Sequence, residues 1–292
     1  MKFLFIVNPK AGHGKAKGLV PLIQNICNKK GVEFKIEYTM APEHATQIAK
    51  EGSKYFDVVA SVGGDGTLNE VVNGIIGSEA ALGVIPGGTG NDFARTIYED
   101  SDIEKILEYI INGEIIRVDL GKCNDRFFIN IGSAGIDSEI AHAVQRSNKI
   151  FSGKSAYLYG LVKTLLKYQG KNFNVSIDEY SFNAKTLLVT ASNGKYYGGG
   201  MLPTPEADIS DGLFDICFIE NMNKLKIPFL LSKYIKGEHI DLREVSMFKG
   251  SKLVITSDEE FAVNIDGEII ITDRAEFEIL KNALNVVIPR NS

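Results

Sequence analysis

The apolar positions of the first 120 residues alternate between unbroken runs and runs with helical spacing. The unbroken or alternating runs, which predict strands, are Lys2–Val7, Val32–Tyr38, Asp57–Val62 and Ala81–Ile85. Apolar residues three and four positions apart predict helices at residues 19–31, 42–51, 67–76 and 103–111. Strands that alternate with helices predict a doubly wound α/β domain, with a mostly parallel sheet covered on both faces.

Beyond Arg117 the pattern changes to short alternating runs separated by turn residues, which predict a mainly antiparallel β-sandwich. The runs are Ile115–Leu120, Phe127–Ile131, Phe173–Ile177, Leu187–Ala191, Leu213–Ile219, Ser246–Phe248, Leu253–Thr256, Phe261–Ile265, Ile269–Thr272, Phe277–Leu280 and Leu284–Ile288. Helices are expected at Ile136–Val144, Tyr157–Tyr168 and Pro228–Ile235. We therefore assign residues 1–122 to the α/β domain and 123–292 to the β-rich domain. The sequence leaves open whether the last few residues return to the first domain.

Composition narrows the class of protein. With 44% hydrophobic residues over 292 positions, the chain has ample material for a core, and a net charge of −5 gives no sign of a nucleic-acid-binding face. The opening apolar run stops at Asn8-Pro9, which is too short for a signal peptide, and no run approaches the length of a membrane span. We expect a soluble, cytoplasmic protein.

The cysteines and histidines show no chemical pattern. The three cysteines, which lie too far apart for a disulfide framework or a zinc site, are Cys27, Cys123 and Cys217. We expect inert core thiols at these positions. The four histidines, expected at surface or capping positions, are His13, His44, His142 and His239.

Glycine-rich turns follow three predicted strands of the first domain: Asn8–Lys15 (NPKAGHGK), Gly63–Thr67 (GGDGT) and Gly87–Asp92 (GGTGND). In a parallel sheet, turns from strand to helix lie at the carboxyl edge, so we expect all three to share one crevice. Glycines let backbone N–H groups approach a ligand, and the helix N-terminus near Thr67 suits phosphate. The convergence predicts a site for a phosphate-bearing ligand.

For each motif, a purely structural explanation competes with the functional interpretation. Turn glycines are common, and Thr67-x-x-Glu70 also fits a capping box at a helix start. Asp266-Gly267, between two β-like runs, is a strong signal for a simple two-residue hairpin. The first turn fits neither the dinucleotide fingerprint nor the nucleotide P-loop, which argues against both classes.

The motifs closely resemble the catalytic domain of the diacylglycerol kinase family, which is related to sphingosine kinases and NAD kinases. The resemblance covers the whole chain in order. The segments that carry it are Asn8–Gly12, Gly63–Gly74, Pro86–Arg95, Asp208–Asp215 and Asp266–Glu268. The closest likeness is to the soluble diacylglycerol kinase of Gram-positive bacteria. The resemblance implies a kinase that uses ATP and Mg²⁺.

The resemblance also implies roles for individual residues. The expected ATP contacts are Asn8, Pro9, Lys10, Ala11, Gly12, Thr39, Gly64, Asp65, Gly66, Thr67, Leu68, Asn69, Glu70 and Thr89. Asp65 is placed in the Mg²⁺–ATP network, and Glu268 matches the general base. Asp208, Asp211 and the Leu213 carbonyl match positions that hold a structural Mg²⁺; the family has Ser where this chain has Asp208. Oxygen donors of this kind suit Mg²⁺.

Three functions remain in competition at this point. The leading one is an ATP-dependent lipid kinase that phosphorylates diacylglycerol or a related neutral lipid and meets it peripherally at a membrane surface. The others are a kinase for a soluble acceptor, as in NAD kinases, and a regulatory module that binds a nucleotide without catalysis. The sequence leaves open whether the protein forms a homodimer. Lys163, Lys167 and Lys171 could help membrane docking, although a solvated helix face is the favoured explanation for them.

Overall fold

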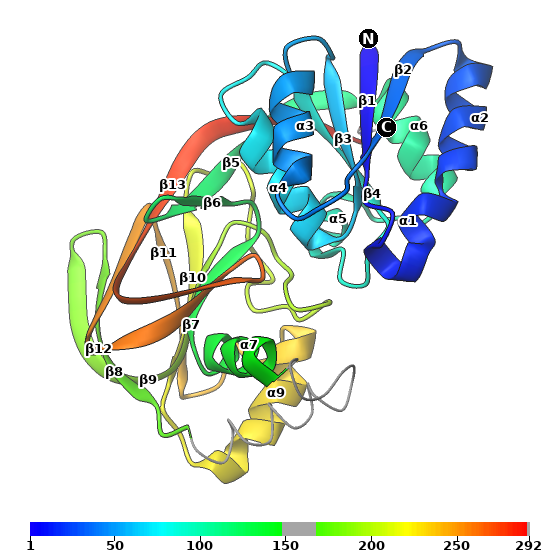
Figure 1. Cartoon of the computed structure of the whole chain (residues 1–292). Helices are drawn as coiled ribbons and strands as arrows, with labels where there is room; N and C mark the ends of the chain where they lie inside the picture. The colour runs from blue at the N-terminus through cyan, green and yellow to red at the C-terminus, as the bar shows by residue number, and fades with distance from the viewer. Residues whose placement is uncertain (148–167, 291–292) are drawn as a thin grey trace. The chain divides into compact units, whose positions relative to one another are not determined.

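The computed structural model describes residues 1–147 and 168–290, and the chain divides into two compact units. Unit 1 comprises residues 1–120, 198–200 and 280–292, and unit 2 comprises residues 121–197 and 201–279 (Figure 1). The helix expected at Tyr157–Tyr168 lies almost wholly outside the described residues.

Unit 1 is built on a parallel sheet whose strands are paired in the order β2-β1-β3-β4. Its strands are β1 (Lys2–Val7), β2 (Glu33–Tyr38), β3 (Val58–Gly63) and β4 (Ala81–Pro86). Its helices are η1 (Ala11–Gly14), α1 (Lys15–Gly18), α2 (Val20–Lys30), α3 (His44–Gly52), α4 (Asp65–Ile75), α5 (Asp92–Ile97) and α6 (Ile103–Asn112). β3 is buried along its whole length, because it pairs with β1 and β4 at its two edges and α4 packs against it. The predicted α/β architecture is confirmed.

Local sequence explains where these helices begin and end. α2 has a proline in its first turn and ends before Gly31, which adopts the left-handed conformation at φ 66°. α6 begins after Asp102, whose side chain accepts a hydrogen bond from the backbone N–H of Glu104. α5 was not predicted, because its six residues are too few to show a helical period and directly follow a glycine-rich turn.

Unit 2 is a mainly antiparallel sandwich, as predicted. Its strands are β6 (Arg126–Phe128), β7 (Ile131–Gly135), β8 (Lys171–Ile177), β9 (Tyr180–Ser192), β10 (Phe214–Glu220), β11 (Val245–Gly250), β12 (Lys252–Ile265) and β13 (Glu268–Ile288), with β5 (Glu114–Cys123) leading into it. Its helical elements are α7 (Ile136–Ser147), η2 (Lys224–Lys226) and α9 (Ile227–Lys236). β8 pairs with both β9 and β12, and the chain's last β13 residues pair in parallel with β4.

Five of the predicted short strands merge into two long ones. Residues 253–265 form the single strand β12 with a register shift between Thr256 and Phe261, and residues 269–288 belong to β13. The charged residues between the apolar runs do not end these strands, because they lie on the exposed face of the ladder. Arg274 and Glu276, for example, lie between two of the predicted runs and pair with each other, and Glu276 also pairs with Lys252 across the two strands.

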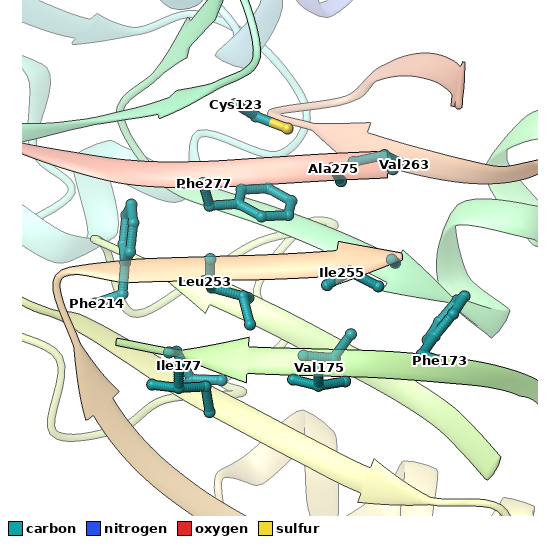
Figure 2. Close-up of a cluster of buried hydrophobic side chains, with 14 of the residues drawn as sticks. Cys123, Phe173, Val175, Ile177, Phe214, Leu253, Ile255, Val263, Ala275 and Phe277 are labelled. Atoms are coloured by element: carbon teal, nitrogen blue, oxygen red, sulfur yellow. The ribbon is translucent and has the colours of Figure 1, made fainter. Parts of the chain in front are cut away.

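Two separate apolar cores stabilise unit 2. The first lies inside the sandwich, where Phe128 stacks on Phe214 with ring centroids 5.8 Å apart and meets Phe277 edge to face. Figure 2 shows side chains from several strands, among them Phe214, Leu253 and Phe277, pointing into this core. The second core lies against α7 and α9, which contribute Ile136 and Leu230 among others.

Candidate active site

The three glycine-rich turns of unit 1 lie together at one edge of its sheet. The backbone N–H of Asn8 donates to Val62 O at 3.0 Å, and that of Gly87 donates to Gly63 O at 2.7 Å. The Asn8 side chain also donates from Nδ2 to the Thr67 hydroxyl at 3.0 Å. These bonds join the first turn to the second and the second to the third, as the common crevice predicted from the parallel sheet requires.

Glycine serves two different purposes in this cluster. A Cβ atom on Gly88 would lie 2.3 Å from Gly64 Cα, so this glycine is required for two turns to pack against each other. A Cβ on Gly66 would meet nothing within 4 Å, and Gly66 is exposed at the start of α4. No side chain caps the α4 N-terminus. Unpaired N–H groups in the first helical turn and the helix dipole make this an attractive position for an anion.

The Asp65 side chain links the second glycine-rich turn to the third. Its Oδ2 accepts from the backbone N–H of Asn91 at 2.8 Å, and its Oδ1 accepts from that of Asp92 at 2.7 Å. Its carboxylate therefore binds the N-terminus of α5, where a negative charge is favourable. Each carboxylate oxygen has two lone pairs, so Asp65 keeps acceptor capacity for a ligand.

The capping box considered as an alternative explanation for Thr67 and Glu70 is not formed. α4 begins at Asp65, and the Thr67 hydroxyl is bonded to Asn8. Glu70 Oε2 instead accepts from the backbone N–H of Ala45 at 3.0 Å, in the first turn of α3. Each side chain thus ties α4 to another element, a tertiary contact that i, i+3 spacing does not reveal.

Asp92 is the notable buried charge of unit 1, at only 5% exposure. Its Oδ2 accepts from the backbone N–H of Gly199 at 2.9 Å, and its Oδ1 has no partner among the described residues. Burial raises the pKa of this carboxyl above its ordinary value, and the nearby Asp65 acts in the same direction, while the Gly199 N–H opposes both. The sequence showed Asp92 beside the third turn but not its link to Gly199.

The predicted ATP-contacting residues differ in their accessibility. The exposed ones are Lys10, Gly66 and Thr89. The partly exposed ones are Asn8, Pro9, Ala11, Gly12, Gly64, Asp65 and Glu70. The buried ones are Thr39, Thr67, Leu68 and Asn69. The first two groups can present atoms to a ligand, whereas the side chains of the last group are withdrawn from solvent.

Asp266-Gly267 in unit 2 forms the predicted two-residue hairpin turn. It joins β12 to β13, with Ile265 opposite Glu268, and both turn residues have positive φ (47° and 94°). The Asp266 carboxylate accepts from three successive backbone N–H groups, those of Ile129 (2.8 Å), Asn130 (3.2 Å) and Ile131 (2.9 Å). Asp266 therefore holds the start of β7 against the hairpin, a function that the turn signal did not reveal.

Glu268 is half exposed beside this turn, and its Oε2 forms an ion pair with Arg126 Nη1. A carboxylate in this position can accept a proton when its arginine partner moves aside. Its role as a base stays a prediction.

The segment expected to hold a structural metal is bonded internally. Asp208 Oδ1 accepts from the backbone N–H and the hydroxyl of Ser210, and Asp211 Oδ1 accepts from the Leu213 N–H at 3.0 Å. Lys249 Nζ lies 2.8 Å from Asp211 Oδ2 and 3.2 Å from the buried Asp215 Oδ2. Burial raises the pKa of Asp215, and Lys249 opposes that rise.

These side chains do not fit Mg²⁺ as they lie. A lysine ammonium already neutralises Asp211, and nowhere in residues 1–147 and 168–290 do three His, Cys, Asp or Glu side chains gather as metal ligands. The assignment of Asp208, Asp211 and Leu213 to a metal stays a prediction that the arrangement does not support.

The structure confirms the prediction that the cysteines are buried and corrects the prediction for one histidine. All three cysteines are buried and free, and burial raises the pKa of Cys27 to about 11 and that of Cys217 to about 12. His239 is fully buried rather than at the surface, with Nε2 3.0 Å from Pro203 O. Burial lowers the pKa of His239, so the folded protein favours its neutral form.

Comparisons with known proteins agree with this arrangement. Residues 2–123 match the Diacylglycerol kinase catalytic domain, and residues 130–288 match the YegS C-terminal NAD kinase beta sandwich-like domain. The chain is 31% identical to the diacylglycerol kinase of Staphylococcus carnosus over 98% of its own length and 94% of that protein. It is 30% identical to the diacylglycerol kinase of Bacillus subtilis, with 98% and 95% covered.

Solved structures share the fold along the whole chain. One from Bacillus anthracis aligns with 98% of this chain and 96% of its own, at a TM-score of 0.78 and 26% identity. Another from the same species, described as a diacylglycerol kinase, gives a TM-score of 0.72 at 24% identity with the same coverage. With matches to both units in the same order and relatives at 30% identity along almost its full length, the chain belongs to the diacylglycerol kinase family.

Proposed function

We propose that this protein is an ATP-dependent lipid kinase that transfers the γ-phosphate of ATP to the hydroxyl of diacylglycerol or a related neutral lipid. Membership of the family supports a kinase that uses ATP. The observation that carries the proposal within this chain is the gathering of three glycine-rich turns around the open N-terminus of α4.

The nucleotide is proposed to place its phosphates over Gly66. The exposed backbone there offers N–H groups, and the Lys10 side chain, exposed on the first turn, can add positive charge. Mg²⁺ bound with ATP would neutralise part of the triphosphate charge, and Asp65 has acceptor capacity toward such a complex. Phosphoryl transfer depends mainly on positioning and charge neutralisation, which a rigid set of backbone donors provides.

Glu268 is proposed to accept the proton of the lipid hydroxyl as the oxygen attacks. Its carboxylate is solvent-accessible, and the hairpin that carries it is held firmly by Asp266. The ion pair with Arg126 must open for this role, which costs little because both partners are about half exposed. No step of the proposal passes through a metal at Asp208 and Asp211.

An acceptor panel tests the proposal directly. ATP consumption would be measured with Mg²⁺ and, in turn, diacylglycerol in mixed micelles, other neutral lipids with a free hydroxyl, and NAD. We expect turnover with diacylglycerol or a neutral lipid and none with NAD. Turnover with NAD alone would establish a soluble-acceptor kinase, and ATP binding with no turnover on any acceptor would establish a regulatory module.

A further inference from the structure

The outward side of α9 and the preceding η2 turn is unusual for a helix at a protein surface. The inward residues Ile227, Leu230 and Tyr234 are buried in the second core of unit 2. A solvated helix would carry polar residues on its other side. Here the outward side also carries apolar residues beside Ser232 and Lys236. Its exposed apolar residues, which we call the α9 face, are Leu225, Pro228, Phe229, Leu231 and Ile235.

The α9 face is well exposed in the described structure. Leu225 is 88% exposed, Phe229 60% and Ile235 47%. These are the large apolar side chains that water solvates least favourably. The residues of α9, drawn in yellow in Figure 1, that belong to the second core of unit 2 are the inward ones, Ile227, Leu230 and Tyr234. Single exposed apolar residues are ordinary, but a group on one short helix marks an interaction surface.

The segment that carries the α9 face contains charges of a single sign. Residues 221–237 contain Lys224, Lys226, Lys233 and Lys236 and no aspartate or glutamate, in a chain whose net charge is −5. Lys226 is paired with Glu244 from outside the segment, and Lys233 Nζ lies 5.6 Å from the centre of the Phe229 ring. An apolar face bordered by lysines complements a surface with negative charge above a hydrocarbon layer.

We propose that the α9 face docks the protein onto anionic lipid bilayers, with Leu225 and Phe229 entering the interface and the lysines meeting lipid phosphates. This rests on the proposed lipid-kinase function for its purpose, but the docking itself needs neither ATP nor diacylglycerol. The proposal does not draw on the lysines considered earlier from the sequence: Lys163 and Lys167 lie outside the described residues, and Lys171 pairs with Glu139.

The chain contains no tryptophan, so Phe229→Trp creates a single fluorescent reporter within the α9 face. The probe is a vesicle of phosphatidylcholine with or without phosphatidylglycerol, in the absence of ATP and diacylglycerol. We expect a blue shift and quenching by brominated lipid with phosphatidylglycerol vesicles only. The matched reporter is Tyr55→Trp in unit 1, 65% exposed in the parent chain, for which we expect no change.

Charge substitutions test the electrostatic contribution to membrane docking. Lys233→Gln with Lys236→Gln should weaken partitioning onto anionic vesicles roughly 25-fold, since each lysine near an anionic surface contributes roughly fivefold. The control is Lys29→Gln with Lys50→Gln, which changes the net charge equally on α2 and α3 and should leave partitioning nearly unchanged. Leu225→Asn should abolish the brominated-lipid quenching of the Phe229→Trp reporter.

Activity separates this proposal from the proposed function. Leu225→Asn should keep full turnover on a short-chain diacylglycerol dissolved as monomers and lose it on vesicles. Kinase activity of the parent chain with no vesicle binding would overturn the docking proposal alone, and vesicle binding without turnover on any lipid would overturn the proposed function alone. A concentration-dependent dimer that Leu225→Asn dissolves, with no vesicle binding, would show that the face is covered by a second copy and would also overturn docking.

Discussion

The two regions that carry the predicted chemistry are organised in different ways. In unit 1 the site residues bond to one another across three separate turns, through Asn8 and Thr67 and through Asp65 and the start of α5. In unit 2 the predicted residues are paired separately with basic residues, Glu268 with Arg126 and Asp211 with Lys249. A mutually bonded cluster can bind a ligand without rearranging, whereas side chains held in ion pairs must first exchange partners. The nucleotide side of the proposed reaction is therefore the better supported one.

The largest effect is expected for Asp65→Ala. The substitution removes a carboxylate from the centre of the cluster and releases the N–H groups of Asn91 and Asp92. We expect phosphoryl transfer to fall by roughly 10³-fold, as for the loss of a preorganised electrostatic group, and unfolding free energy to fall by about 1–2 kcal/mol for the lost helix cap. Thermal melts and ATP-consumption assays measure the two losses.

Asp102→Ala is the matched control for Asp65→Ala. Asp102 caps α6 by accepting from the Glu104 N–H at 2.9 Å and belongs to none of the three glycine-rich turns. It should show a similar stability loss and normal turnover. If Asp65→Ala keeps the normal turnover expected for Asp102→Ala, Asp65 is a helix cap and takes no part in phosphoryl transfer.

A smaller but still large effect is expected for Glu268→Gln. The base hypothesis predicts a loss of turnover of roughly 10²-fold, the lower end for a general base, because a loose transition state needs little help in removing the proton. Stability should not change, since the Arg126 pair is exposed and Asp266-Gly267 keeps the turn. Steady-state kinetics at saturating ATP with diacylglycerol in mixed micelles measure the loss.

Arg126→Gln separates the base from the ion pair. It breaks the same contact but keeps the Glu268 carboxylate, so turnover should stay within about threefold of the parent, against the roughly 10²-fold loss expected for a base. If both variants lose turnover equally, the ion pair rather than the base is what matters. If neither does, Glu268 is simply the first residue of β13.

Gly66→Ala should weaken ATP binding without weakening the fold. A Cβ at Gly66 meets no protein atom, and alanine is the better helix former by about 1 kcal/mol, so stability should hold or rise. Phosphates bound over this N–H would meet the new methyl group, and we expect about a tenfold rise in the dissociation constant for ATP, or 1.4 kcal/mol. Titration calorimetry and thermal melts give both values.

Gly18→Ala is the matched glycine substitution. Gly18 is also helical, also open around its Cβ position, and belongs to α1. It should leave ATP affinity unchanged. Unaltered affinity in Gly66→Ala as well would place the phosphates elsewhere than the α4 N-terminus.

The smallest effect is expected for Mg²⁺ without nucleotide. Lys249 already neutralises Asp211, so Mg²⁺ or EDTA should change Tm by less than about 2 °C, which is under about 1 kcal/mol for a chain of this size. A larger rise that Asp211→Asn abolishes, and that Asp125→Asn at an exposed position does not, would instead establish the magnesium site implied by the family resemblance.

The sequence by itself determined the architecture and the common edge of the three turns. Apolar periodicity distinguishes strands from helices, and a parallel sheet places every strand-to-helix turn on the same side, so Gly63–Thr67 and Gly87–Asp92 had to be neighbours. The Asp266-Gly267 hairpin was equally predictable, because few residue pairs tolerate two successive positive φ angles.

Only the tertiary structure decided the partners of the charged residues. Glu70 binds the start of α3, Asp92 binds Gly199, Asp266 binds residues 129–131, and Lys249 takes the place beside Asp211 that the resemblance assigned to a metal. Each contact joins residues at least 25 positions apart, and hydrophobic periodicity carries no information about such pairs. Hydrogen bonds and ion pairs are short-ranged, so their partners depend on how the elements pack, which no local pattern encodes.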